Sequence, residues 1–211
     1  DTIAEHVEGM KEPLRNIFDK KEEDYKQFYK IIDHSTFYIE IVCPDCSKYH
    51  TSLRLLKGES FALLTKKLIE NMYIGSSFKE TIHCDTDDSY CVDIYGDFNL
   101  PQTDVKVHLI IQCKTRRKTN AGIKLNELKE FVGGSKAYIY SKKEKLILSE
   151  MHPITMIYIT NSFFNDDCIN YMKKIGITYI DAEKYIKLII RNSLLNTFIK
   201  LTKHNKKGTL K

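Results

Sequence analysis

A predicted buried strand that ends in two polar side chains is the feature that most constrains the fold of this chain. Residues 107–111 are apolar except for His108, and the run leads into Gln112 and Lys114. An apolar run of this length is typical of a buried strand. Because side chains alternate between the two faces of a strand, Gln112 and Lys114 share one face. The sequence therefore predicts a strand over 106–114 that presents an amide and an amine together.

A second short strand is predicted upstream, over 92–96, and it carries a single carboxylate, Asp93, between Val92 and Ile94. On a strand this carboxylate faces the side opposite its two apolar neighbours. We expect it to share a site with Gln112 and Lys114. The competing interpretations are a turn or strand-edge aspartate and an exposed lysine at a strand end.

The set Asp93, Gln112 and Lys114 resembles the PD-(D/E)XK nuclease superfamily, in the Mrr-like branch where glutamine replaces the second acid. Further segments follow in the order of that family, and the resemblance covers about residues 57–190. These segments are a basic stretch over 115–118, a helix start over 125–130, a late strand and turn over 157–164, and a short strand over 177–181.

The resemblance implies a metal-dependent nuclease domain that hydrolyses DNA phosphodiester bonds. Asp93 would hold Mg²⁺ or Mn²⁺, and Gln112 would support the metal or its waters. Lys114 would orient the attacking water or neutralise phosphate charge. The resemblance also suggests a homodimer, because cutting two DNA strands calls for two sites.

The basic stretch after the predicted catalytic strand contains Arg116, Arg117 and Lys118. Guanidinium groups bind phosphate in a bidentate manner, which favours a loop that contacts nucleic acid. The alternative is a solvated run of charge on the surface.

Two positions depart from the family pattern. The first core helix of the family carries G-x-x-F-E, and here residues 58–62 place Ala62 at the acid position. Glu59 lies one turn earlier on about the same face, so it either supplies the missing carboxylate or only favours the start of the helix. The turn before Asp93 also lacks the family's glycine. These departures favour the alternative of a degenerate pseudo-nuclease that binds nucleic acid or a protein partner.

A CxxC pair, Cys43 and Cys46, lies at the tip of a predicted hairpin, and His50 follows it. Two thiolates at this spacing form one half of a structural Zn²⁺ site. Cys84 and Cys91 are the candidates for the second half, although they form no second CxxC. The alternative is an ordinary turn with free thiols.

The predicted fold class is α/β, a restriction-endonuclease-like mixed β-sheet flanked by helices, with an N-terminal helical and hairpin extension. The 211 residues, 42% of them hydrophobic, suit one domain with an appendage. We divide the chain into an N-terminal helical segment and CxxC hairpin (1–56), a core domain (57–202) and a basic tail (203–211).

The predicted elements follow the hydrophobic periodicity of the chain. Helices are expected over 1–34, 57–73, 122–132, 164–175 and 181–202. Strands are expected over 36–56 as a hairpin, and over 79–83, 91–97, 106–114, 154–160 and 177–180. Residues 136–149 fit either a hairpin or an irregular helix.

Composition and missing motifs narrow the function classes. The sequence shows no glycine-rich phosphate loop, no G-x-S-x-G and no H-E-x-x-H, and it has no segment of about 20 apolar residues that would suit a membrane helix. Cys113 and Cys168 lie within apolar patterns and are expected to be reduced core thiols. We therefore expect an intracellular protein with no membrane association. The family resemblance implies DNA as its partner, and a place in the nucleus or mitochondrion if the protein is eukaryotic.

Overall fold

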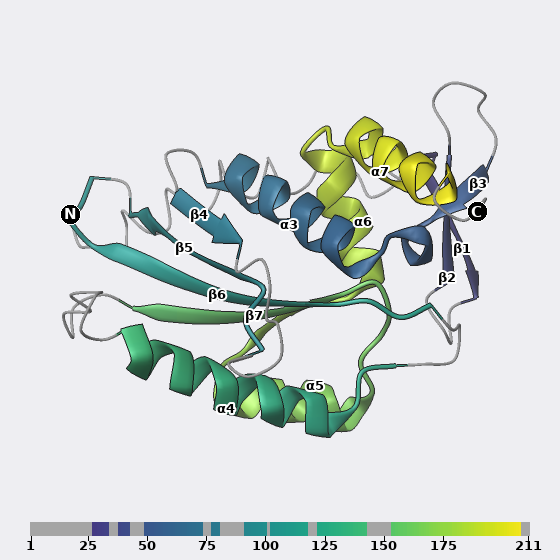
Figure 1. Cartoon of the computed structure of the whole chain (residues 1–211). Coiled ribbons are helices and arrows are strands. Elements are labelled where there is room, and N and C mark those ends of the chain that lie inside the picture. The colour runs from purple at the N-terminus through teal and green to yellow at the C-terminus, as the bar shows by residue number, and fades with distance from the viewer. Residues whose placement is uncertain are drawn as a thin grey trace, which may run out of the picture.

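The computed structural model describes most of the chain from residue 27 onward. The described ranges are 27–33, 38–42, 49–73, 77–80, 91–100, 102–117, 122–142 and 153–207. Within them the chain forms a five-stranded sheet, a separate three-stranded sheet and helices on both sides of the larger sheet (Figure 1).

The larger sheet is mixed, and its strands follow one another in chain order. It consists of β4 (Ser77–Glu80), β5 (Ile94–Asn99), β6 (Lys106–Lys114), β7 (Ile154–Thr160) and β8 (Thr178–Ile180). The pairs β4–β5 and β5–β6 are antiparallel, whereas β6–β7 and β7–β8 are parallel. The predicted mixed sheet is confirmed, and β6 and β7 have the predicted bounds.

Helices cover both faces of this sheet, as predicted for the α/β class (Figure 1). One face carries α3 (Gly58–Met72), α6 (Ala182–Arg191) and α7 (Leu195–Lys207), and the other carries α4 (Leu125–Lys142) and α5 (Asp166–Ile175). Neighbouring residues of β6 pack into different hydrophobic cores. Ile111 packs in the core beneath α3, α6 and α7, and Ile110 packs in the core beneath α4 and α5. Such double coverage explains why the strand is almost continuously apolar.

Local signals in the sequence set the ends of two helices. Asn165 caps α5 by accepting from the backbone N–H of Cys168, and Gly176 ends it at φ 75°, a conformation that favours glycine. Asp181 caps α6 in the same way, by accepting from the backbone N–H of Lys184. These caps fix where the chain leaves β7 and β8.

The smaller sheet precedes α3 and corrects one prediction. It contains β1 (Tyr29–Asp33), β2 (Tyr38–Val42) and β3 (Tyr49–Ser52), paired antiparallel, and a 3-10 turn, η1 (Leu53–Leu55), follows it. The helix predicted over 1–34 is wrong at β1, because pairing with β2 overrides the helical spacing of the aromatic residues. Residues 1–26 lie outside the described ranges.

Several other element boundaries differ from the prediction. Strand β4 begins at Ser77 rather than at residue 79, and α5 begins at Asp166 rather than at residue 164. The single helix expected over 181–202 is two helices, broken where Ser193 adopts φ 57°. The helix expected over 122–132 is α4, which continues to Lys142, so the first part of the ambiguous segment 136–149 is helical. Strand β5 begins at Ile94 rather than before it.

Cysteines and hydropathy give two further findings. Cys113 and Cys168 are free and buried, as predicted. Among the helices that the structure describes, none has the length and apolar character needed to cross a bilayer.

The predicted zinc site lies mostly outside the described residues. Cys43, Cys46 and Cys84 are not among them, and His50 is placed only as a backbone position in β3.

Candidate active site

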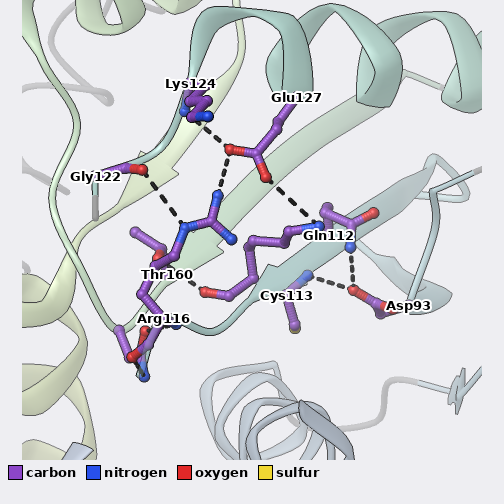
Figure 2. Close-up of polar contacts among 10 residues, drawn as sticks. Asp93, Gln112, Cys113, Arg116, Gly122, Lys124, Glu127 and Thr160 are labelled. Atoms are coloured by element: carbon purple, nitrogen blue, oxygen red, sulfur yellow. Dashed lines mark hydrogen bonds and ion pairs between the residues drawn. The ribbon is translucent and has the colours of Figure 1, made fainter. Parts of the chain in front are cut away.

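The backbone brings Asp93 to the end of β6. Cys91 adopts a left-handed conformation at φ 52°, and the backbone N–H of Asp93 then donates to the carbonyl of Ile111 at 2.9 Å. Asp93 Oδ2 accepts two hydrogen bonds, from the backbone N–H of Cys113 at 2.6 Å and from Gln112 Nε2 at 2.5 Å (Figure 2). Two donors therefore hold one oxygen of this carboxylate against β6.

The predicted neighbourhood of Asp93 is correct, but the predicted geometry is wrong. Val92 packs in the core beneath α4 and α5, whereas Ile94 packs in the core beneath α3, so the two do not share a face opposite Asp93. The reason is that Asp93 precedes the first residue of β5, where regular strand alternation does not yet apply. Its carboxylate reaches β6 from the strand end.

Gln112 has one atom engaged and one free for a ligand. Its Nε2 donates to Asp93, which leaves Oε1 as an acceptor. That oxygen is buried and has no hydrogen-bond partner among the residues that the structure describes. A buried acceptor without a partner is costly, so such an atom is typical of a position that a water, an ion or a substrate completes.

Asp93, Gln112 and Lys114 line one pocket of about 190 Å³. Its remaining lining residues are Cys91, Glu127, Glu130 and Tyr158. The side chain of Lys114 is 42% exposed, so it is partly open to solvent. The three residues predicted from β5 and β6 are thus brought together.

Burial raises the pKa of the Asp93 carboxyl above its ordinary value. The Cys113 N–H, the charge of Lys114 and the Gln112 amide act in the opposite direction but do not outweigh burial. A carboxyl with this balance favours a nearby cation, because a cation would stabilise its charged form.

Glu127, in the first turn of α4, is a site residue that the sequence analysis missed. Its Oε1 lies 3.6 Å from Lys114 Nζ, and its Oε2 pairs with Arg116 Nη2 and accepts the backbone N–H of Lys124 at 2.9 Å (Figure 2). Burial alone would raise the pKa of Glu127, but these partners lower it. The available signal was an acid in the first turn of a helix that directly follows a basic loop.

The side chains of the last residue of β7 and of the residue after it make hydrogen bonds to the backbone at and beyond the end of β6. Thr160 Oγ1 donates to the carbonyl of Lys114 at 2.8 Å. Asn161 is buried, and its amide accepts from the Arg116 N–H at 2.7 Å and donates to the Arg116 carbonyl at 3.2 Å. Asn161 also donates to the carbonyl of Leu53 at 3.4 Å. The backbone on either side of Thr115 is therefore fixed.

The remaining predicted site residues are Glu59, which lies away from the pocket, and the basic stretch after β6, whose members differ in burial. Glu59 is exposed in the first turn of α3 and is not part of the pocket lining. Arg116 is mostly buried and paired with Glu127, with its side chain 17% exposed. Arg117 is exposed, and Lys118 lies outside the described residues.

The chemistry of the pocket fits a hard divalent cation. Asp93 supplies a carboxylate oxygen, and Gln112 supplies the buried Oε1 that has no partner among the described residues. Mg²⁺ and Mn²⁺ prefer oxygen ligands of this kind. Across the described residues, no group of three or more His, Cys, Asp or Glu side chains is placed to hold a metal ion. The fit therefore depends on one carboxylate, one amide oxygen and water.

The comparisons with known proteins concern the fold. No family model matches the chain, and no curated protein sequence matches it significantly. Two solved structures resemble it. The MspJI restriction endonuclease in complex with a 27-mer oligonucleotide has a TM-score of 0.45 and 14% identity over 72% of this chain. The DNA modification-dependent restriction endonuclease AspBHI has a TM-score of 0.46 and 12% identity over 70% of this chain.

The chain spans about a third of the length of these two proteins, 32% and 34% respectively.

Proposed function

We propose that this chain is a metal-dependent nuclease domain of the Mrr-like PD-(D/E)XK type, which hydrolyses DNA phosphodiester bonds. The observation that carries the proposal is the shared pocket of Asp93, Gln112 and Lys114, in which the buried Gln112 Oε1 is left without a partner among the described residues. A structural hydrogen bond between strands would not require this unpartnered acceptor or the accessible amine beside it.

The side chains of the pocket have separate roles in this mechanism. Asp93 and Gln112 Oε1 would hold Mg²⁺ or Mn²⁺, which when bound supplies Lewis-acid activation and offsets phosphate charge. Lys114 orients the attacking water and donates to a phosphate oxygen, where negative charge increases in the transition state. The backbone N–H of Cys113 and the amide of Gln112 keep Asp93 Oδ2 in place.

DNA is the proposed substrate because phosphate is the group that this pocket suits and a basic segment directly follows it. Lys114 lines the pocket, and the exposed Arg117 follows it by three residues along the chain. The formal net charge of +5 adds a general attraction for a polyanion.

A second candidate is a pseudo-nuclease that binds nucleic acid or protein without cutting. The observation that favours it is that the described residues hold no group of three His, Cys, Asp or Glu side chains placed to bind a metal ion. Ala62 at the acid position of α3 agrees with this alternative.

Cleavage of supercoiled plasmid DNA in Mg²⁺ or Mn²⁺ separates the two functions. The proposal predicts nicked and linear products that EDTA prevents and that Asp93→Ala and Lys114→Ala each abolish. The matched control is Lys187→Ala, which removes a lysine paired with Glu183 on α6, far from the pocket lining. Binding without any cleavage in either metal would favour the pseudo-nuclease, and cleavage that persists in both site variants would point to a contaminant.

A further inference from the structure

Glu127 connects the pocket to the segment that follows β6. One carboxylate oxygen lies 3.6 Å from Lys114 Nζ, and the other pairs with Arg116. Both side-chain partners come from the end of β6 and the residues just beyond it, whereas Glu127 comes from α4. The Glu127 carboxylate therefore links Lys114, the predicted catalytic lysine at the end of β6, to α4.

Part of the role of Glu127 is that of a helix cap. As the third residue of α4, it accepts the backbone N–H of Lys124 at 2.9 Å, which is one half of a capping box. This contact uses Oε2, and it accounts for an acid at the position. It does not account for Oε1, which faces Lys114.

Charge explains what Oε1 adds. Lys114 and Arg116 both contact the same carboxylate, so two cations lie within a few ångströms of each other. With the carboxylate charged, each cation has a counter-ion. Without that charge the two cations repel. Lys114 is then the one that moves away, because its side chain is more exposed than that of Arg116 and lies further from the carboxylate.

We infer that Glu127 is a positioning residue that holds the Lys114 ammonium in the pocket beside Asp93 and Gln112. Its partner Arg116 then has a structural role rather than that of a phosphate ligand. It links the segment after β6 to α4 by pairing with Glu127 and donating to the carbonyl of Gly122. The effect of this positioning on turnover rests on the proposed nuclease function, but the position of the Lys114 side chain does not.

The substitution Glu127→Gln separates positioning from capping. The glutamine carbonyl can still accept the Lys124 N–H, but the charge that holds Lys114 is lost. We expect turnover of plasmid DNA to fall roughly 10–100-fold, the usual effect of losing a supporting partner of a site residue. The KM for DNA should change little, because Lys114 acts on negative charge that increases in the transition state rather than on ground-state binding.

A spectroscopic readout tests the position of Lys114 without any activity. In ¹⁵N-lysine NMR spectra of the whole chain, the Lys114 ammonium signal is identified by its loss in Lys114→Ala. Glu127→Gln should shift that signal and speed its exchange with water. The control Glu183→Gln makes the same change in a surface ion pair with Lys187 on α6, and it should leave the Lys114 signal and turnover as in the wild type.

The results distinguish this inference from the proposed function. A shifted Lys114 signal with no nuclease activity in the wild type would uphold the positioning and reject the nuclease. An unchanged Lys114 signal in Glu127→Gln would overturn the positioning, whatever the activity. If the glutamine variant does not fold, Glu127→Asp replaces it, because aspartate keeps the charge but lies one methylene further from Lys114. A Lys114 signal that Glu127→Asp leaves unchanged would also overturn the inference.

Discussion

The side-chain amide of Gln112 donates a hydrogen bond to Asp93 Oδ2 at 2.5 Å, although 19 residues separate the two. The bond uses one N–H of the Gln112 amide, and the buried oxygen of that amide has no partner within the described structure. One polar pair therefore presents a carboxylate and an amide oxygen to the same pocket.

Replacing Asp93 with asparagine should stabilise the metal-free protein at neutral pH. Both hydrogen bonds end on one oxygen, so the asparagine carbonyl can keep them. Burial raises the pKa of the Asp93 carboxyl, so its folded-state pKa lies above its unfolded value. The stability that Asp93 contributes is then fully present below its unfolded pKa and is lost as pH rises through the folded pKa.

Melting temperatures in EDTA check this pH dependence. The gain of Asp93→Asn over wild type should be largest near pH 7.5 and should shrink as pH approaches about 4, the ordinary pKa of an aspartate. Asp104→Asn, a change at an exposed acid, is the control for general effects of charge. A gain that is the same at both pH values would contradict the burial of the Asp93 charge.

Substitutions of Gln112 should change the response to metal in opposite directions. Gln112→Glu places a second carboxylate within hydrogen-bond distance of Asp93, and two such charges repel unless a cation lies between them. We expect this variant to melt below wild type in EDTA and to gain more from Mn²⁺. Gln112→Leu removes the unpartnered oxygen and should lose most of the gain. Thermal melting with and without Mn²⁺ measures both, and equal gains in all three proteins would rule out Gln112 as a ligand.

The two arginines after β6 should differ in what they do. Arg116→Ala should lower the free energy of unfolding by about 1.5–3 kcal/mol, the usual value for a hydrogen bond to a charged group, because Arg116 is mostly buried against Glu127. Arg117→Ala should leave stability unchanged and should reduce the slope of log affinity for duplex DNA against log salt by about 0.9.

Urea unfolding and DNA binding at several salt concentrations measure the two effects. A reduced salt slope in Arg116→Ala together with reduced stability in Arg117→Ala would contradict the burial of Arg116 against Glu127 and the exposure of Arg117.

Asn161→Ala should destabilise the protein by about 1–3 kcal/mol for each buried backbone group left without a partner. Its amide is buried and contacts both backbone groups of Arg116 and the carbonyl of Leu53. Asn170→Ala, an exposed asparagine on α5, is the matched control. Equal unfolding free energies for the two variants in urea would show that the segment after β6 does not depend on Asn161.

The sequence was sufficient where one strong local pattern acted alone. The bounds of β6 and β7 follow from their apolar runs, because strands covered on both faces need apolar residues throughout. The spacing of Gln112 and Lys114 likewise placed them on one face. The neighbourhood of their partner Asp93 follows because β5, which begins directly after Asp93, and β6 are consecutive along the chain and pair with each other.

The sequence was insufficient where tertiary contacts decided the outcome. The residues of β1 have helical spacing, but pairing with β2 makes them a strand. Ser193 interrupts the last predicted helix without any glycine or proline to mark the break. Glu127 became visible as a site residue only through its contacts with Lys114 and Arg116, which depend on how α4 packs beside the end of β6.

The most direct test of the central claim is a crystal of the protein soaked with Mn²⁺, read by anomalous diffraction. The account predicts an anomalous peak bonded to the Asp93 carboxylate and to Gln112 Oε1, with Lys114 Nζ facing the same pocket, and no peak in Asp93→Ala. The absence of any peak beside Asp93 at saturating Mn²⁺, or a peak bound only by other residues, would contradict it.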